Sequence, residues 1–158
     1  MSITVAGTIL VAGSHWFGIT ASETEGLWGR VTITVDGRSQ WVFQEPVWRP
    51  IAVGCGPEST FMWSAREVIR LPESGDDAPE IVARADEDVL LVFEHEHGWV
   101  LVCESSVRRV CGGKETARWE LPGVVVGAAW RGTELAVLSE GGGEVLLEVA
   151  GTGLICRD

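Results

Sequence analysis

Two apolar runs flank a short polar tip in residues 89–103, VLLVFEHEHGWVLVC. Residues 89–93 and residues 99–103 are rich in the aliphatic, β-branched and aromatic side chains that favour strands. The tip between them combines charged residues with Gly98, as hairpin turns commonly do. This stretch therefore predicts a β-hairpin, and its first run has the continuous apolar character of a strand that is buried on both faces.

Two further hairpins are predicted on either side of this one. Residues 30–43 alternate between apolar and polar side chains around Asp36-Gly37, a pair that favours the type I′ turn of tight hairpins. Residues 134–149 contain two apolar runs separated by the glycines at 141–143. The apolar residues 1–12 have no basic segment before them and are interrupted by Thr and Gly, so they predict a strand rather than a signal peptide. The whole pattern indicates an all-β fold.

The sequence also contains an internal repeat with a unit of about 36 residues. Residues 51–54 (IAVG) match residues 124–127 (VVVG), and an apolar run opens shortly after each, at Thr60 and at Thr133. Gly98 lies close to the midpoint between those two threonines and opens a similar run. The chain therefore has room for roughly four units of roughly four strands each.

Four short antiparallel strands per unit is the pattern of a β-propeller blade, and in this respect the chain resembles β-propeller proteins. The resemblance implies a small propeller of about four blades in a single domain over residues 1–158, with the repeat clearest in residues 48–149. A β-barrel or a β-sandwich is the alternative, because a series of hairpins closes equally well into either. A helix over residues 59–71, stopped by Pro72, is a further alternative that would make the fold mixed.

The net charge of −11 excludes several classes of function. Binding to nucleic acid or to anionic lipid depends on clustered Lys and Arg. Here Arg108-Arg109 is the single adjacent basic pair, and Lys114 is the single lysine. No apolar run reaches the ~18 residues of a membrane-spanning helix. We therefore expect no nucleic-acid partner and no membrane partner.

The four cysteines, at positions 55, 103, 111 and 156, form no CxxC motif and lie in or beside apolar stretches. This pattern indicates small buried side chains in a reduced, cytoplasmic protein rather than a disulfide framework. The excess of Arg over Lys and the absence of Asn and Tyr also match the coding bias of a GC-rich genome, which suggests a bacterial source.

His95 and His97 are the candidate metal ligands. Residues i and i+2 of a strand point to the same side, so two imidazoles at this spacing can chelate a divalent metal. Glu94, His15 or Cys103 could supply a third ligand, although the sequence places none of them nearby. The alternative interpretation is an exposed polar hairpin tip, which the flanking charges and Gly98 favour.

The sequence contains no catalytic constellation. Ser14 and His15 are adjacent, and neighbours in a strand face opposite sides, so they do not predict a nucleophile beside its base. The glycines at 112–113 and 141–143 lack the flanking residues of a phosphate loop and predict hairpin turns. We therefore expect a chain that is not an enzyme and binds no cofactor.

Acidic loops and tryptophans are the candidate contact residues for a protein partner. Carboxylates gather between residues 73 and 96, and among them Asp76, Asp77, Asp86 and Asp88 are the residues that we expect to steer a basic partner. Trp28 and Trp130 flank glycines and are expected at turns, where an exposed indole can make contacts.

The sequence thus favours a non-catalytic protein-binding module with an acidic surface, and an immunity or inhibitor protein that covers a basic partner is one form of such a module. A small-ligand or carbohydrate binder with tryptophan platforms is one alternative. A metal-dependent enzyme that uses His95 and His97 is another. Self-association is compatible with each of them, because an open set of repeats can be completed by a second copy.

Overall fold

The fold is all-β in the computed structural model of this chain. The structure describes residues 3–12, 15–25, 28–35, 37, 39–46, 52–64, 66–72 and 78–157, and every regular element in these residues is a strand. The expectation of an all-β fold is confirmed. The alternative of a helix over residues 59–71 is wrong, because this segment forms two strands of a hairpin.

The described residues form sixteen strands in four separate sheets of four strands each. The first two sheets comprise β1 (Ile3–Ala12), β2 (His15–Glu25), β3 (Trp28–Val35) and β4 (Ser39–Pro46), then β5 (Ala52–Cys55), β6 (Thr60–Ser64), β7 (Glu67–Leu71) and β8 (Glu80–Arg84). The other two comprise β9 (Val89–His95), β10 (Gly98–Cys103), β11 (Ser106–Cys111) and β12 (Lys114–Glu120), then β13 (Val125–Arg131), β14 (Glu134–Ser139), β15 (Gly143–Ala150) and β16 (Gly153–Arg157).

Each sheet is a simple meander in which consecutive strands pair antiparallel. The three predicted hairpins are confirmed as β3–β4, β9–β10 and β14–β15. Gly37, Gly112, Gly113, Gly141 and Gly143 all have positive φ, so the predicted glycine turns are turns of the left-handed kind that suits twisted hairpins. Thr60 and Gly98 open β6 and β10, and Thr133 directly precedes β14, so the matched positions stand at the second strands of three successive sheets.

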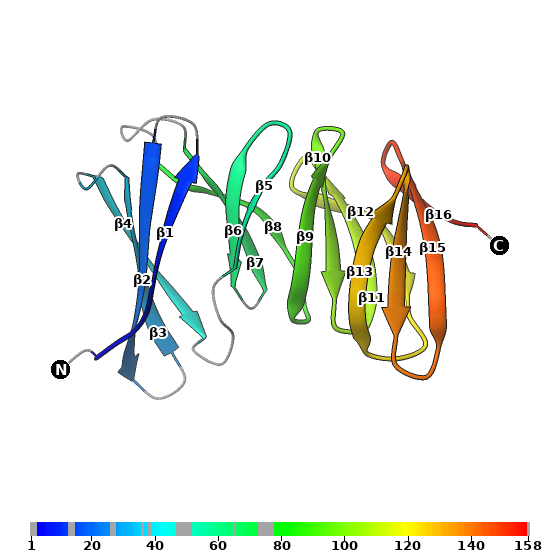
Figure 1. Ribbon diagram of the computed structural model, residues 1–158, viewed down its shortest axis with the longest axis horizontal. Coiled ribbons are helices and arrows are strands. Elements are labelled where there is room, and N and C mark those ends of the chain that lie inside the picture. The colour runs from blue at the N-terminus through cyan, green and yellow to red at the C-terminus, as the bar shows by residue number, and fades with distance from the viewer. Residues whose placement is uncertain are drawn as a thin grey trace.

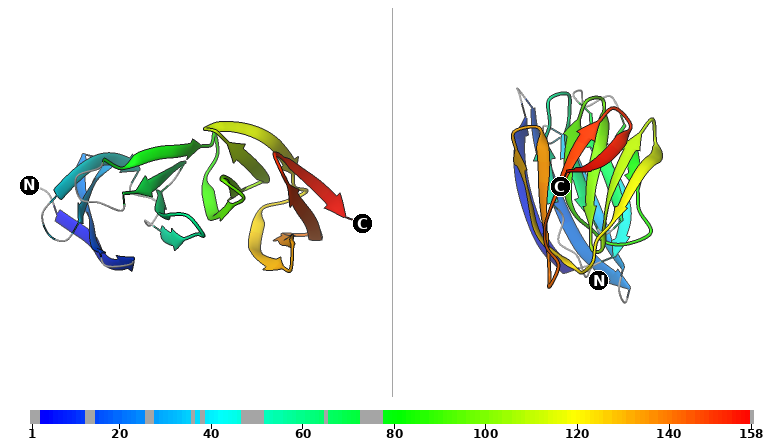
Figure 2. Two further views of the ribbon diagram at one scale, coloured as in Figure 1. Left: turned by 90° about the horizontal axis from the view of Figure 1, so that it is seen from above. Right: turned by 90° about the vertical axis from the view of Figure 1, so that its right-hand side faces the viewer.

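The sheets stand side by side in an open, curved row, with the chain ends at opposite ends of it (Figures 1 and 2). Between the second and third sheets, β5 and β6 lie next to β9, and between the third and fourth sheets, β10 lies next to β13 and β12 lies next to β16. The described residues therefore form neither a barrel, which is one closed sheet, nor a two-sheet sandwich. They also show no closed ring of sheets (Figure 2).

The core lies between the faces of neighbouring sheets. Phe61 and Trp63 of β6 pack against Trp99 and Leu101 of β10, and Phe61 meets Trp99 edge to face with ring centroids 4.9 Å apart. On the other side of β10, Val100 and Val102 pack against β13–β16. All six residues of β10 are buried, so the strand buried on both faces is β10, whereas the expectation had placed it at residues 89–93.

Gly98 is required by close packing at the start of β10. A Cβ atom built on it would lie 2.8 Å from the carbonyl oxygen of Val110 and 3.0 Å from Nη1 of Arg109. Contacts this short do not occur for real side chains, and both neighbours are held inside the molecule. The residue that suggested a turn in the sequence therefore also makes room for a buried arginine.

Candidate functional site

The linkers between sheets and the turns inside them meet along one edge of the molecule, which we call the linker edge: residues 85–88, 104–105, 121–124 and 140–142. Backbone hydrogen bonds join these segments. The amide of Glu104 donates to the carbonyl of Asp88 over 3.0 Å, and that of Glu140 donates to Val124 over 2.8 Å. Linker amides need such partners because they lie outside the sheet ladders. The result is a continuous edge built from segments far apart in sequence.

Carboxylates are concentrated on this edge and beside it. The side chain of Asp86 is 75% exposed and that of Glu120, at the end of β12, is 67% exposed. Glu104 and Glu140 are exposed as well. Asp86 is among the residues predicted from the sequence, whereas Glu104, Glu120 and Glu140 are not. Strand pairing within the third sheet brings Glu104 and Glu120 to this edge, and the stacking of the fourth sheet adds Glu140 beside Val124.

A buried arginine lies behind the linker edge. Arg108 of β11 is 4% exposed, and its Nη2 atom lies 2.5 Å from Asp86 Oδ1 and 3.3 Å from Glu87 Oε1. Its Nη1 atom lies 3.5 Å from Glu115 Oε1. Ser105 donates a hydrogen bond of 2.6 Å to Glu87, and Ser106 donates a second one. The guanidinium therefore anchors the linker 85–88 to the third sheet.

These contacts shift the pKa values of the carboxyls that they join. The hydrogen bond and the positive charge of Arg108 lower the pKa of Asp86. Burial alone would raise the pKa of Glu87, but the hydrogen bonds from Ser105, Ser106 and Arg108 and the charge of Arg108 outweigh it, so this pKa is lowered too. Both groups stay ionised to more acidic pH than usual.

The other acidic residues expected to contact a partner have different surroundings. Asp88 is 17% exposed, and its Oδ1 atom lies 3.7 Å from Nε of Arg66. Asp76 and Asp77 lie outside the described residues. Of the four selected aspartates, Asp86 is thus the one that the structure shows on the exposed surface, and one of its oxygens already binds Arg108.

Trp130 is half-buried and lies inside β13, so the expectation that it stands at a turn is wrong. It packs between Phe93, with ring centroids 5.7 Å apart, and His95, on which it stacks at 5.0 Å. Trp28 begins β3 and pairs with Glu25 across the predicted turn, but its side chain is outside the described part of the structure. Whether either indole contacts a partner stays a prediction.

His95 and His97 do not share one side of a strand, because β9 ends at His95. Glu96 and His97 form the two-residue turn, with φ angles of 44° and 61°. His97 Nδ1 lies 2.5 Å from Glu58 Oε1, and Glu94 accepts hydrogen bonds from the amides of Glu58 and Ser59. Within the described residues, no group of three His, Cys, Asp or Glu side chains is placed to hold a metal ion.

The basic pair Arg108-Arg109 is internal. Arg109 is fully buried and donates hydrogen bonds to the carbonyl oxygens of Gly151 (3.0 Å), His95 (2.9 Å) and Glu96 (3.5 Å). It therefore ties the β9–β10 turn of the third sheet to the β15–β16 turn of the fourth. Neither arginine is available to a nucleic acid, because both side chains are occupied inside the molecule.

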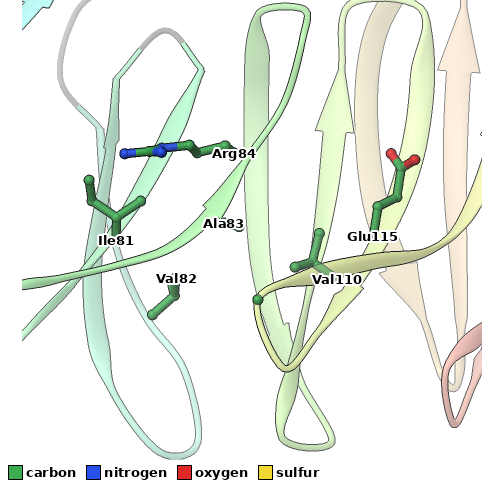
Figure 3. Close-up of a pocket in the computed structure, with 7 residues that line it drawn as sticks. Ile81, Val82, Ala83, Arg84, Val110 and Glu115 are labelled. Carbon is green, nitrogen blue, oxygen red and sulfur yellow. The ribbon is translucent and has the colours of Figure 1, made fainter.

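A hollow of about 280 Å³ lies between β8 and the β11–β12 hairpin (Figure 3). Ile81, Val82 and Val110 make its apolar wall, while Arg84 and Glu115 come to it from different sheets. Both charges are already paired, Arg84 with Glu67 at 3.1 Å and Glu115 with Arg118 at 3.1 Å.

No tryptophan lines this hollow. Among the described tryptophan side chains, Trp63 and Trp99 are buried, and Trp119 and Trp130 pack against the core between the third and fourth sheets. The described part of the chain therefore offers no exposed aromatic platform of the kind that a carbohydrate binder uses.

No protein-family model matches the chain, and no curated protein matches it in sequence. Among the described residues, there is no helix with the length and apolar character needed to span a membrane.

Proposed function

We propose that this chain is a non-catalytic protein-binding module whose linker edge recognises a basic protein surface. The observation that carries the proposal is the gathering of Asp86, Glu104, Glu120 and Glu140 from four separate segments onto one edge. Arg118 lies 3.9 Å from Asp86 and 3.6 Å from Glu120, so the four carboxylates still leave an excess of negative charge on this edge. An exposed excess of one sign that is held by a rigid scaffold steers a partner of opposite sign and fixes its orientation.

The scaffold supports this function in the way that propeller blades do. We propose that the four meander sheets are propeller-type blades, because the chain runs from the first strand outward in each sheet and then passes to the first strand of the next. In such repeats the loops at the ends of the strands are free to vary while the stacked sheets keep them in place. The linker edge is a loop edge of this kind.

The internal arginine strengthens the proposal. Arg108 holds the linker 85–88 against β11, so the exposed carboxylate of Asp86 is fixed in position before a partner arrives. A fixed loop loses less conformational entropy on binding than a flexible one, and affinity rises accordingly. An enzyme with a basic active site, which this chain would cover as an inhibitor, is one partner class that this arrangement suits.

The test measures binding of a peptide of roughly ten lysines by titration calorimetry, as a minimal basic partner. The double variant Glu104→Lys/Glu140→Lys changes the linker edge without touching the Arg108 contacts. Glu80→Lys/Glu96→Lys is the matched control, because these exposed residues lie in β8 and in the β9–β10 turn and the change in net charge is the same.

We expect the linker-edge variant to weaken binding roughly tenfold more than the control does, and added salt to reduce the difference. An equal loss of affinity in the two variants would show that the peptide responds to net charge alone. The proposal that the linker edge is the binding surface would then be wrong. No measurable binding to the unchanged protein would also contradict the proposal.

A further inference from the structure

The linker between the third and fourth sheets, residues 121–124, is a rigid part of the linker edge and lies at the same end of the fourth sheet as the β14–β15 turn (Figure 1). Three backbone hydrogen bonds attach it and the residue that follows it to other segments of this edge: Leu121 donates to Ser105 over 3.0 Å, Val125 to Glu104 over 2.9 Å, and Glu140 to Val124 over 2.8 Å. A Cβ atom built on Gly123 would lie 2.2 Å from the carbonyl oxygen of Glu140, so the two backbones are in direct contact. The linker therefore holds its neighbours in fixed positions before a partner arrives.

Glu104 and Glu140 flank this linker from opposite sides. The carbonyl of Val124, which accepts from Glu140, and the amide of Val125, which donates to Glu104, belong to one peptide group. In a trans peptide these two groups point in opposite directions, so one glutamate lies on each side of the linker. Two strand spacings then separate the two glutamate backbones, which is roughly 10 Å.

Both glutamates carry exposed charges that no internal cation neutralises. Neither of them pairs with an Arg, Lys or His side chain of the described residues. Asp86 and Glu120 differ in this respect, because both lie near Arg118. A cation from a partner can therefore approach Glu104 and Glu140 without displacing an internal arginine.

Two exposed apolar side chains lie on the linker between these charges. Val124 is 44% exposed, and Pro122 is exposed as well. Pro122 packs against the β14–β15 turn, since a Cβ atom built on Gly142 would lie 2.4 Å from its Cγ atom. An apolar centre with a charged rim is the usual composition of an interface between proteins. We call this surface, which comprises Glu104, Pro122, Val124 and Glu140, the valine patch.

A buried hydroxyl without a hydrogen-bond partner lies next to the valine patch. Ser139 is 3% exposed and pairs in the sheet with Val125, and its Oγ atom has no hydrogen-bond partner among the described residues. A Cβ atom built on Gly142 would lie 2.7 Å from this Oγ atom, so the hydroxyl faces the same turn that Pro122 contacts. A buried hydroxyl without a partner costs free energy, and a polar group of a bound protein can supply the bond. The turn consists of glycines, whose backbone can shift to admit that group.

We propose that the valine patch binds an extended segment of the partner that carries a basic, an aliphatic and a basic residue at alternate positions. This inference rests on the proposed function of the linker edge and names the part of the partner that the edge recognises. Alternate residues of an extended segment point to the same side, and the two cations stand roughly 13 Å apart. The long side chains of Lys and Arg cover the difference from the roughly 10 Å between the glutamate backbones.

Each part of this segment has its own contact. The aliphatic side chain packs on Val124 and Pro122, and the two cations meet Glu104 and Glu140. A polar group of the segment donates to or accepts from Ser139 Oγ. The charges give the segment its orientation, while the aliphatic contact distinguishes it from a purely basic sequence.

The experiment measures the binding of two peptides by titration calorimetry. Each peptide has about ten lysines around one central residue, which is leucine in the first peptide and serine in the second. The patch variant is Val124→Ser. Its matched control, Ile81→Ser, removes an aliphatic side chain of similar exposure from β8, 39% against 44%. Circular dichroism checks that each variant is folded, and Val124→Thr, which keeps the shape of the side chain, replaces the patch variant if it is not.

We expect the unchanged protein and the control to bind the leucine peptide roughly fivefold more tightly than the serine peptide. In the patch variant the two affinities should become equal. Equal affinities in the unchanged protein, or a preference for leucine that survives in the patch variant, would overturn the inference and leave the linker edge as a binding surface for basic peptides. Failure of both peptides to bind would contradict the proposed function and this inference with it.

Ser139→Ala tests the hydroxyl separately. Because Ser139 Oγ has no hydrogen-bond partner among the described residues, we expect no loss in the free energy of unfolding, which urea unfolding measures. We expect the affinity for both peptides to fall roughly threefold, because their polar groups lose this bond. An unchanged affinity would show that Ser139 makes no bond to the partner, and this part of the inference would then be wrong.

Discussion

At the scale of single residues, two adjacent arginines show how one sequence pattern can serve two structural roles. Strand alternation sends Arg108 to one face of the third sheet and Arg109 to the other. Arg108 meets carboxylates at the linker edge, whereas Arg109 meets only backbone carbonyls between the third and fourth sheets. The pair is the single adjacent basic pair of the sequence, and the sheet places its two side chains at two separate internal contacts.

Replacement of Arg109 should lower the free energy of unfolding far more than replacement of a surface arginine does. In Arg109→Ala, the carbonyls of Gly151, His95 and Glu96 lose their buried donor, and we expect a loss of about 3 kcal/mol in the free energy of unfolding. Arg70→Ala, which breaks an exposed contact of 3.6 Å with Glu80, should cost less than about 1 kcal/mol. Urea unfolding measures both, and similar losses in the two variants would contradict the role given to Arg109.

The carboxyl groups around Arg108 predict a loss of stability in acid. Because folding lowers the pKa of Glu87, its interactions stabilise the fold fully above the ordinary value of 4.5 and are lost as the pH falls through the lower, folded value. Glu87→Gln should therefore destabilise the protein at neutral pH and cost progressively less below pH 4.5. Glu140→Gln, the same change at an exposed position of the linker edge, is the control. Urea unfolding across the acid range measures this, and a penalty for Glu87→Gln that does not change with pH would count against it.

At the scale of elements, β10 and β14 show why similar strands play different parts. Both follow a predicted turn and both are mainly aliphatic. The strand β10 lies between two sheets and is buried on both faces, whereas β14 packs on one face and leaves Leu138 exposed. The difference comes from position in the stack rather than from the composition of the strand.

This difference predicts unequal costs for the same substitution. Leu101→Ala removes a fully buried side chain from the core between the second and third sheets, and we expect a loss of about 2–5 kcal/mol in the free energy of unfolding. Leu138→Ala, at 46% exposure, should cost less than about 1 kcal/mol in the monomer. Denaturant unfolding at low protein concentration compares the two, and equal losses would argue against the burial described for β10.

At the scale of the whole molecule, the four sheets are held together through the contacts between neighbours. Stability in such a stack is a sum of sheet and interface contributions, so interfaces can open without complete unfolding. Cys103 reports on this, because it lies buried between the second and third sheets and burial raises the pKa of its thiol to about 12. Cys55 is exposed and provides an internal comparison.

Alkylation of native protein at about pH 8 should therefore modify Cys55 quickly and Cys103 only as the sheets separate. Denaturant should raise the rate at Cys103 steeply and the rate at Cys55 little. Peptide mass spectrometry after timed labelling measures both rates. Comparable reactivity of the two thiols in native protein would show that the second and third sheets do not form a stable interface.

The hairpins and the all-β class could be predicted from local sequence patterns, because hydrophobic periodicity and turn chemistry act between neighbouring residues. The hairpins at 30–43, 89–103 and 134–149 all follow from such local signals. It also indicated the acidic character of the surface, with Asp86 on the exposed edge that the structure shows.

Local patterns could not predict which residues share a surface, because that depends on how the strands pair and how the sheets stack. Strand pairing within the third sheet brings Glu104 and Glu120 to the edge of Asp86. Stacking adds Glu140 to that edge, turns Trp130 inward against His95, and buries both arginines of the basic pair. It also leaves Leu138 exposed where Trp63 and Val102 are covered. No local pattern distinguishes these three positions, since what differs among them is whether another sheet lies on the same face.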